Sequence, residues 1–213
     1  MRHYLSHARF VHLKLISYVP RSTELRLCYQ VKNCGTDFRW NMFGMTSKDG
    51  DNISSGLKSC RKLRRICIRN SLMNDDNLYA LCDGLRNSAK LTTLLVPNNC
   101  LVCESPLSPF TTMHSNSFLQ TDEAIPVLVK FLATHSLKRL DLSNNRLTCE
   151  GVIMLAKCLE TSGVKGQLKR LNLSLNNIGK AGCYALCQVI RARFIVPIQY
   201  KVVHSLRSGD AIL

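Results

Sequence analysis

The feature that most constrains the fold is a pattern of apolar residues that recurs at fixed spacing. Two stretches, one beginning at Leu137 and one at Leu168, carry apolar residues, an asparagine and a glycine at the same offsets. The matched pairs are Leu137 and Leu168, Leu140 and Leu171, Leu142 and Leu173, Asn145 and Asn176, Leu147 and Ile178, Gly151 and Gly182, Leu155 and Leu186, and Leu159 and Ile190. A unit of this length cannot bury its apolar face alone, so such units must stack on one another.

The offsets match the L-x-x-L-x-L-x-x-N-x-L signature of leucine-rich repeats. Two further copies begin at Leu63 and Leu91. The starts at Leu63 and Leu91 lie 28 residues apart and those at Leu137 and Leu168 lie 31 apart, which leaves room for a helix after each strand. The sequence therefore predicts an α/β fold, a solenoid of the ribonuclease-inhibitor-like type with parallel strands on its concave face and helices on its convex face.

The two best copies also predict the positions of individual elements. Strands are expected at 139–142 and 170–173, and helices near 151–159 and 182–190.

Asparagines stand at the bend that follows a strand. They are Asn99, Asn145 and Asn176, and Ser71 takes this place in the copy that begins at Leu63. Because an amide both donates and accepts hydrogen bonds, we interpret these asparagines as ladder residues that bond to backbone groups. Their predicted role is structural rather than catalytic.

The repeats divide the chain into three predicted parts: residues 1–60, an N-terminal segment and capping unit; residues 61–190, the repeats; and residues 191–213, a basic tail. The interval from Leu91 to Leu137 is too long for one repeat, and its excess, residues 102–120, is rich in hydroxyl side chains and includes prolines. This composition predicts an inserted, exposed loop. The tail either caps the last repeat or ends a shortened solenoid.

The formal net charge of +15 favours acidic partners such as nucleic acid, an anionic membrane or an acidic protein surface. The apolar stretch near the N-terminus is interrupted by His12 and Lys14 and lacks a small-residue cleavage site, so no signal peptide is predicted. No apolar run approaches the roughly 20 residues that cross a bilayer. We expect a cytosolic or nuclear protein without membrane insertion.

The 11 cysteines are odd in number and are scattered among hydrophobic positions, which favours buried, reduced thiols. Cysteines at such positions are Cys67, Cys82, Cys158, Cys183 and Cys187. Cys100 and Cys103 have the spacing of half a zinc site, but no second pair follows. The N-terminal histidines His3, His7 and His12 are expected to be solvated. No metal site is predicted.

Trp40, with Phe38 and Phe43, suggests either a platform for nucleic-acid bases or the core of the capping unit. One tryptophan and seven phenylalanines give no interleaved basic and aromatic array, so core packing is favoured. No phosphate-binding glycine loop, metalloprotease motif or hydrolase motif is present. The sequence predicts no enzymatic activity, no cofactor, no small-molecule substrate and no nucleic-acid partner.

Cations recur between the first two leucines of the repeats. The residues at these positions are Arg64 and Arg65, Thr92 and Thr93, Lys138 and Arg139, and Lys169 and Arg170. Neighbouring parallel strands lie about 4.8 Å apart, so the cations of adjacent repeats repel one another. We predict a basic column on the concave face that binds an acidic partner. The alternative is a solvated face on which the long side chains spread apart.

The segment before the repeats is the most distinctive part of the chain, and residues 25–43 read LRLCYQVKNCGTDFRWNMF. It resembles the YGVKDCGMNFEWNLF segment of the family of leucine-rich-repeat subunit 5 of the dynein regulatory complex. Residues 60–63 and 71–76 resemble the first repeat of that family. The resemblance covers roughly residues 20–190.

The resemblance implies a non-catalytic scaffold in the nexin–dynein regulatory complex, which links outer doublet microtubules in motile cilia and sperm flagella. Its expected partners are other subunits of that complex and axonemal proteins, and its expected location is the axonemal cytoskeleton. The inserted segment, the tail and the smaller number of repeats depart from the family pattern.

Two other classes of protein use repeats of this subtype. One is the Ran-type GTPase-activating protein, for which an acidic tail is expected, whereas the tail of this chain is basic. The other is the innate-immune receptor, for which an upstream ATP-binding domain is expected.

Overall fold

A computed structural model gives the fold, and the structure describes residues 2–6, 23–28, 45–99, 124–160 and 168–193. The elements in chain order are β1 (Arg2–Ser6), β2 (Glu24–Cys28), α1 (Ser47–Leu57), β3 (Arg65–Arg69), α2 (Asp75–Leu85), β4 (Thr93–Leu95), α3 (Ala124–Thr134), β5 (Arg139–Asp141), α4 (Cys149–Glu160), β6 (Arg170–Asn172) and α5 (Gly179–Arg193).

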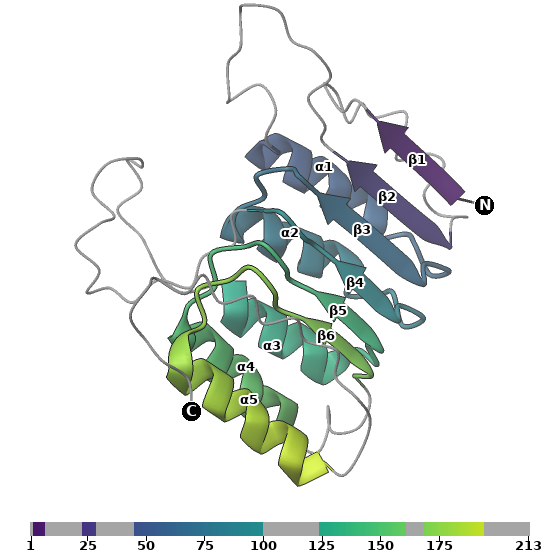
Figure 1. The fold of residues 1–213 in the computed structure, drawn as a ribbon. Coiled ribbons are helices and arrows are strands. Elements are labelled where there is room, and N and C mark those ends of the chain that lie inside the picture. Colours follow the sequence, from purple (N-terminus) through teal and green to yellow (C-terminus); the bar gives the residue numbers. More distant parts are fainter. Residues whose placement is uncertain (1, 7–22, 29–44, 100–123, 161–167, 194–213) are drawn as a thin grey trace, which may run out of the picture.

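The strands form one sheet in which β1 to β6 lie side by side in chain order, and every neighbouring pair is parallel. The helices cover one face of this sheet (Figure 1). Strands lie about 4.8 Å apart and packed helices about 8–10 Å apart, so the stack curves with the sheet on its inner side. The parallel strands β5 and β6, followed by α4 and α5, confirm the elements predicted for the two best repeats.

The sheet begins before the first repeat that the leucine pattern predicts. Strand β2 pairs with β3 along its length, beginning with Glu24 opposite Arg65, and β1 pairs in turn with β2. Leu25 and Leu27 of β2 are buried in the same core as the leucines of the later strands. The predicted N-terminal capping unit therefore continues the sheet.

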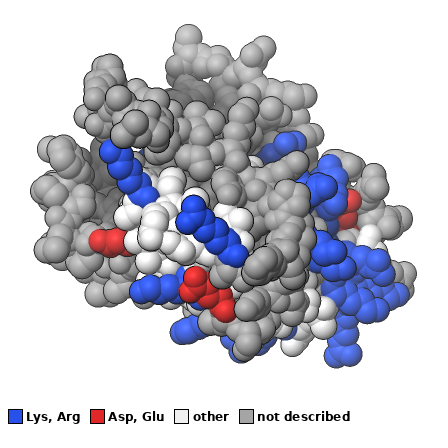
Figure 2. All heavy atoms as spheres, turned by 60° about the horizontal axis from the view of Figure 1, so that its bottom comes forward, with Lys and Arg blue, Asp and Glu red and all other residues white. Residues whose placement is uncertain are grey.

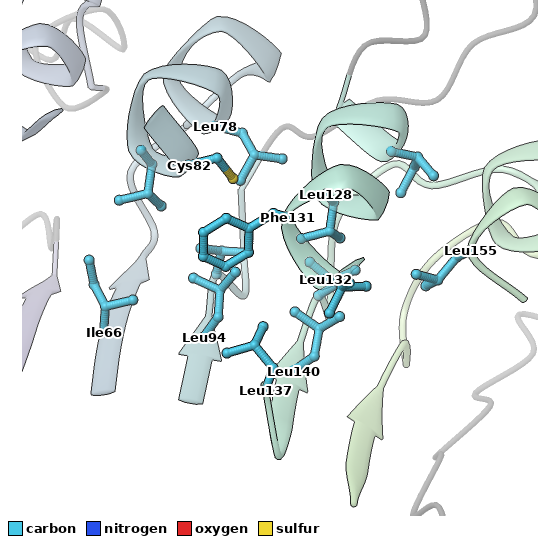
Figure 3. Close-up of a cluster of buried hydrophobic side chains, with 14 of the residues drawn as sticks. Ile66, Leu78, Cys82, Leu94, Leu128, Phe131, Leu132, Leu137, Leu140 and Leu155 are labelled. Atoms are coloured by element: carbon cyan, nitrogen blue, oxygen red, sulfur yellow. The ribbon is translucent and has the colours of Figure 1, made fainter. Parts of the chain in front are cut away.

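The repeated apolar residues are the core. Leu140 of β5 is fully buried, as is Leu94 of β4. The ring of Phe131 from α3 lies between the side chains of Leu78 and Cys82 on α2 and the strand residue Leu94 (Figure 3). Truncating a buried leucine to alanine lowers the free energy of unfolding by about 2–5 kcal/mol. The repeat pattern therefore marks the positions at which substitutions destabilise the fold most.

Two helices begin with reciprocal caps. The Thr46 hydroxyl accepts a hydrogen bond from the Asp49 backbone N–H, and the Asp49 carboxylate accepts one from the Thr46 backbone N–H at 2.9 Å. Asn74 and Asn77 cap α2 in the same way. The Asn77 amide also donates to the Thr46 carbonyl oxygen at 3.2 Å. Asn77 stands where the later repeats carry glycine, and its side chain ties the starts of α1 and α2 together.

After four of the strands the chain turns through a residue with positive φ. Asn70, Asn98 and Asn144 adopt φ of 56°, 55° and 50°, and asparagine tolerates this conformation. Leu175 takes the equivalent place after β6, with φ of 60° and 53% of its surface exposed. The left-handed conformation costs an ordinary residue about 1–2 kcal/mol, so the last of these corners is strained.

The cysteines from Cys60 onward that the structure describes differ in exposure. Burial raises the pKa of Cys60 to about 11 and that of Cys82 to about 12, so both stay protonated at neutral pH. Cys158 is also buried. Cys67 and Cys183 are only half-buried, and the prediction was wrong for Cys187, which is exposed because it lies on the outer side of α5.

Several predictions lie outside the described residues. They concern the inserted segment 102–120, the stretch 29–43, and Cys100 and Cys103. Of the predicted basic tail, residues 191–193 continue helix α5, and the remainder lies outside the described part.

Candidate functional site

The strand register divides the predicted basic column into two rows. Strands β3, β5 and β6 begin at the second cation of each pair, Arg65, Arg139 and Arg170. These arginines alternate along their strands with buried leucines or isoleucine, so they lie on the face of the sheet away from the helices. With their register partners they form the concave row: Glu24, Arg65, Thr93, Arg139 and Arg170.

The first cation of each pair lies one residue before its strand. Consecutive backbone hydrogen bonds stack these positions, from Thr92 N–H to Arg64 C=O (2.9 Å), from Lys138 N–H to Thr92 C=O (2.8 Å) and from Lys169 N–H to Lys138 C=O (2.8 Å). We call this set the edge row: Arg64, Thr92, Lys138 and Lys169. It borders the concave face, where the sheet meets the loops that enter the strands.

Arg139 and Arg170 are register partners on adjacent strands. At a separation of about 5 Å, two such charges repel by about 1 kcal/mol in water and about 3 kcal/mol at the effective dielectric of a protein surface. Arg139 is half-buried and Arg170 is exposed, so spreading of the side chains reduces this cost without removing it.

One acidic residue shares this part of the concave face. Asp141 follows Arg139 by two residues and faces the same side of β5. Its Oδ1 accepts hydrogen bonds from the Ser143 backbone N–H at 3.0 Å and the Ser143 hydroxyl at 2.7 Å. Asn172 and Ser174 repeat this turn after β6 with a neutral amide. No ion pair between Asp141 and Arg139 occurs in the described part of the chain.

At the other end of the concave row lies Glu24, a residue that the sequence pattern did not assign to any repeat and that pairs with two arginines. Its Oε1 lies 2.6 Å from Arg26 Nε and 3.4 Å from an Arg65 guanidinium nitrogen. Glu24 is buried, with 6% of its surface exposed. The sequence did contain a signal for this repeat, because Leu25 and Leu27 alternate with Arg26. When these two leucines are aligned with the second and third leucines of the repeat signature, Glu24 falls at the position that Arg65 occupies in the next repeat.

The ladder asparagines bond to backbone groups of their own repeat and of the preceding one. Asn99 Nδ2 donates to the carbonyl oxygens of Ile68 and Val96, both at 3.0 Å, and its Oδ1 accepts from the Ser71 backbone N–H and hydroxyl. Ser71 thereby fills the first ladder position with help from the next repeat.

The next two asparagines repeat the arrangement. Asn145 Nδ2 donates to Val96 (3.1 Å) and Leu142 (2.9 Å) carbonyl oxygens. Asn176 Nδ2 donates to the carbonyl oxygens of Leu142 (2.9 Å) and Leu173 (3.0 Å). All these contacts are structural. The candidate binding groups of the inner face are therefore the arginines of the concave row.

The described residues contain no group of three or more His, Cys, Asp or Glu side chains arranged to hold a metal ion. Among them, no helix is both long enough and apolar enough to cross a membrane.

Comparisons with known proteins agree with the repeat geometry. A family model described as leucine-rich repeat matches residues 134–156 and 168–187. The ribonuclease inhibitor of Sus scrofa is 27% identical over 157 residues, which cover 68% of this chain and 34% of that protein. A solved structure of leiomodin-1 actin-binding site 2 aligns with a TM-score of 0.51 at 16% identity, covering 84% of this chain and 88% of that chain.

The fold is a leucine-rich-repeat solenoid. The expected parallel strands on the concave face and helices on the convex face are therefore confirmed for the described residues.

The family resemblance also has a counterpart in the comparisons. Dynein regulatory complex subunit 5 of Macaca fascicularis is 29% identical over 87 residues, which cover 41% of this chain and 17% of that protein. The subunit of the same name from Mus musculus is 30% identical over 87 residues. The chain is thus similar to subunit 5, and the match spans about a sixth of the length of these relatives.

Proposed function

We propose that this solenoid is a non-catalytic scaffold subunit of the nexin–dynein regulatory complex in motile cilia and flagella. There it helps to regulate microtubule sliding and sperm motility. The observation that carries the proposal is the similarity to dynein regulatory complex subunit 5 over 87 residues. Its partners are other subunits of that complex and axonemal proteins, and its location is the axonemal cytoskeleton.

The architecture supports a role in protein binding. A stack of repeats presents an extended concave face, and the hydrogen bonds of the ladder hold the backbone at the end of successive strands. Such a surface needs no reorganisation to receive a partner.

On this surface the contact we propose for an acidic partner is the pair Arg139 and Arg170. Their charges repel within the solenoid, and a carboxylate placed between them would accept charge-assisted hydrogen bonds from both. Arg65 joins the site less strongly because it already pairs with Glu24. The edge residues Arg64, Lys138 and Lys169 border the same surface and contribute to long-range attraction.

Localisation tests the proposed role directly. The full chain, tagged and expressed in multiciliated cells, is expected in the axoneme and is expected to co-purify with other subunits of the regulatory complex. Exclusion of the tagged chain from axonemes, or its recovery without any of those subunits, would contradict the proposal.

Affinity measurements test the contact. The double variant Arg139→Glu and Arg170→Glu is expected to bind a purified regulatory complex lacking this subunit about tenfold or more weakly at low salt, because two attractive charges become repulsive. Moderate salt is expected to narrow the difference through screening. Melting temperature serves as the folding control, and we expect it to change little, because the two glutamates repel each other about as the two arginines did and each lies next to a cation, Lys138 or Lys169.

A matched control reverses the same amount of charge elsewhere. Lys157 on α4 and Lys180 on α5 are exposed and lie outside the concave row. The variant Lys157→Glu and Lys180→Glu is expected to keep nearly full affinity. Equal losses in both double variants would show that net charge alone, rather than the concave arginines, governs binding.

A further inference from the structure

All the loops that run from the end of a helix to the start of the next strand lie at one edge of the solenoid, because every strand is parallel to its neighbours. The described loops at this edge are 58–64, 86–92 and 135–138, together with the end of the loop before β6 at 168–169. The backbone hydrogen bonds of the edge row join them in sequence.

Hydrogen bonds join the loops at this edge into one rigid surface, which we call the platform. The buried Ser88 hydroxyl donates to the Cys60 carbonyl oxygen at 3.0 Å, which ties the second loop to the first. His135 Nε2 lies 3.2 Å from the Leu85 carbonyl oxygen, and the His135 ring stacks on Phe131 with centroids 4.0 Å apart. The loops therefore hold their shape before any partner arrives.

Exposed cations gather on the platform. Two of them, Lys58 and Arg86, share the carboxylate of Asp83 at 3.0 and 2.8 Å. Six others make no ion pair within the described part of the chain: Arg61, Lys62, Arg64, Lys90, Lys138 and Lys169. We call these six the edge cations.

Helix dipoles do not explain the edge cations. A helix C-terminus attracts positive charge, but the effect fades beyond the last turn. The last turns of α1, α2 and α3 contain no basic residue, and the edge cations stand further along the loops. Exposed like charges on neighbouring loops repel one another, so their accumulation is a cost to the isolated fold.

The opposite edge of the solenoid carries charges of both signs, and its cations include Lys48 and Lys180 in the first turns of α1 and α5. The first turns of α1, α2 and α4 carry Asp49, Asp75, Asp76 and Glu150. Figure 2 shows lysine and arginine side chains gathered toward the right of the view, the side on which the strands lie in Figure 1, with few acidic side chains among them. An anionic partner is thus drawn to the edge at which cations predominate.

We propose that the edge cations form a second docking surface, separate from the concave row, and that its occupant is an extended acidic segment of a protein. The loops offer what carboxylates need, which is exposed ammonium and guanidinium groups on a fixed backbone. This surface goes beyond the scaffold role proposed above and does not depend on it.

Two other anionic partners fit the platform less well. Single-stranded nucleic acid requires aromatic side chains for stacking, and the exposed tyrosines of the described residues, Tyr79 and Tyr184, lie within α2 and α5. A membrane surface requires apolar side chains that insert, and the described edge loops keep their apolar residues buried, including Leu63, Leu91 and Leu137.

The size of the platform sets the length of the segment. From Arg64 to Lys169 the edge row crosses the spacing of β3 to β6, about 14 Å, which an extended chain of about five residues spans. A run of acidic residues of this length or slightly longer satisfies the surface.

The test uses the full chain and a fluorescent peptide of about 12 glutamates, which is longer than the platform. Anisotropy is measured at about 0.01 M and about 0.15 M salt, where the screening length is about 30 Å and about 8 Å. A polyglutamine peptide is the uncharged control. The edge variant replaces Lys62, Lys90, Lys138 and Lys169 by glutamine, and loss of four exposed ion pairs is expected to weaken binding about tenfold or more at low salt.

Two control variants place the site. One removes four exposed cations elsewhere by Lys48→Gln, Arg146→Gln, Lys157→Gln and Lys180→Gln, and it is expected to lose much less affinity. The other neutralises the concave pair without reversing it, Arg139→Gln and Arg170→Gln, and it is expected to lose less affinity than the edge variant because it removes two charges rather than four. If the edge variant binds as well as wild type, or if the four-charge control loses as much as the edge variant, the proposal is wrong.

Two further probes decide between partner classes. Oligothymidine and phosphatidylserine vesicles are added to the same wild-type and edge-variant proteins, with circular dichroism as the folding control. Tighter binding of either probe than of polyglutamate, with the same dependence on the edge cations, would assign the surface to that class instead. The result is independent of whether the chain enters the axoneme, so failure here and failure of the scaffold role are distinguishable.

Discussion

The two ends of the concave row carry arginines at the same repeat offset and in different surroundings. At one end Arg65 lies 3.4 Å from Glu24, which is buried and also pairs with Arg26. At the other end Arg139 lies opposite Arg170. The offset within a repeat decides which face a side chain occupies, whereas the residue one strand away decides whether its charge is compensated. One end of the row is therefore a structural ion cluster and the other is available to a partner.

The change with the largest expected effect turns the compensated end into a like-charged one. Glu24→Lys is expected to lower the free energy of unfolding by about 3 kcal/mol, because it leaves two arginines and a new cation together. The value stands at the low end for such a change because Arg26 and Arg65 reach solvent. Denaturant unfolding followed by circular dichroism measures it.

A shape-matched variant separates charge from packing. Glu24→Gln keeps the side-chain volume and adds no cation, so its loss is expected to be smaller. If both variants unfold at the wild-type midpoint, Glu24 does not stabilise this end of the row and the contrast between the two ends is removed.

The asparagine ladder holds the ends of successive strands along the concave row. A substitution in the ladder is expected to cause the next largest loss of stability. Asn145→Ala is expected to cost about 1–3 kcal/mol, because the carbonyl oxygens of Val96 and Leu142 lose a buried donor. Melting of the variant checks this. An unchanged melting curve would mean that the amide does not support the strand ends.

The smallest expected effect lies at the corner after β6. Leu175→Asn is expected to raise the free energy of unfolding by about 0.5–1 kcal/mol, since asparagine accepts the left-handed conformation at less cost than leucine. The matched control is Asn144→Leu at the equivalent corner after β5, which is expected to lower it by a similar amount. If both changes stabilise the protein, or if neither does, backbone conformation does not explain the difference in stability between the two corners.

The sequence predicted the repeats wherever leucine and asparagine filled the signature. The matched offsets of the repeats that begin at Leu137 and Leu168 are mostly those of buried residues, although Asn176 and Ile190 are only partly buried, so the repeat pattern largely reflects burial. The repeat pattern did not identify strand β2, although Leu25 and Leu27 keep the alternation. Ser22 stands where the signature requires leucine, and Gln30 stands where it requires asparagine. Two apolar residues in a short run do not distinguish a strand from other structure.

The candidate site was predicted only in part for the same reason. The pairing of Arg139 with Arg170 followed from the spacing of two recognisable repeats, and the register contains it. The ion pair of Glu24 with Arg65 depends on contact with a strand 41 residues away in sequence. The separation of Lys138 from Arg139 depends on where the strand begins, and a pattern of offsets does not fix that boundary within a residue.

The ladder has a direction. Asn99 reaches back to Ile68, Asn145 to Val96 and Asn176 to Leu142, so each of these asparagines bonds to a residue at or just after the end of a strand made earlier in the chain. A ribosome delivers residues in that same order, and each new asparagine emerges after its acceptor. The repeats can therefore fold in the order in which they are synthesised. Each folded repeat then supplies the hydrogen-bond acceptors for the asparagine of the next.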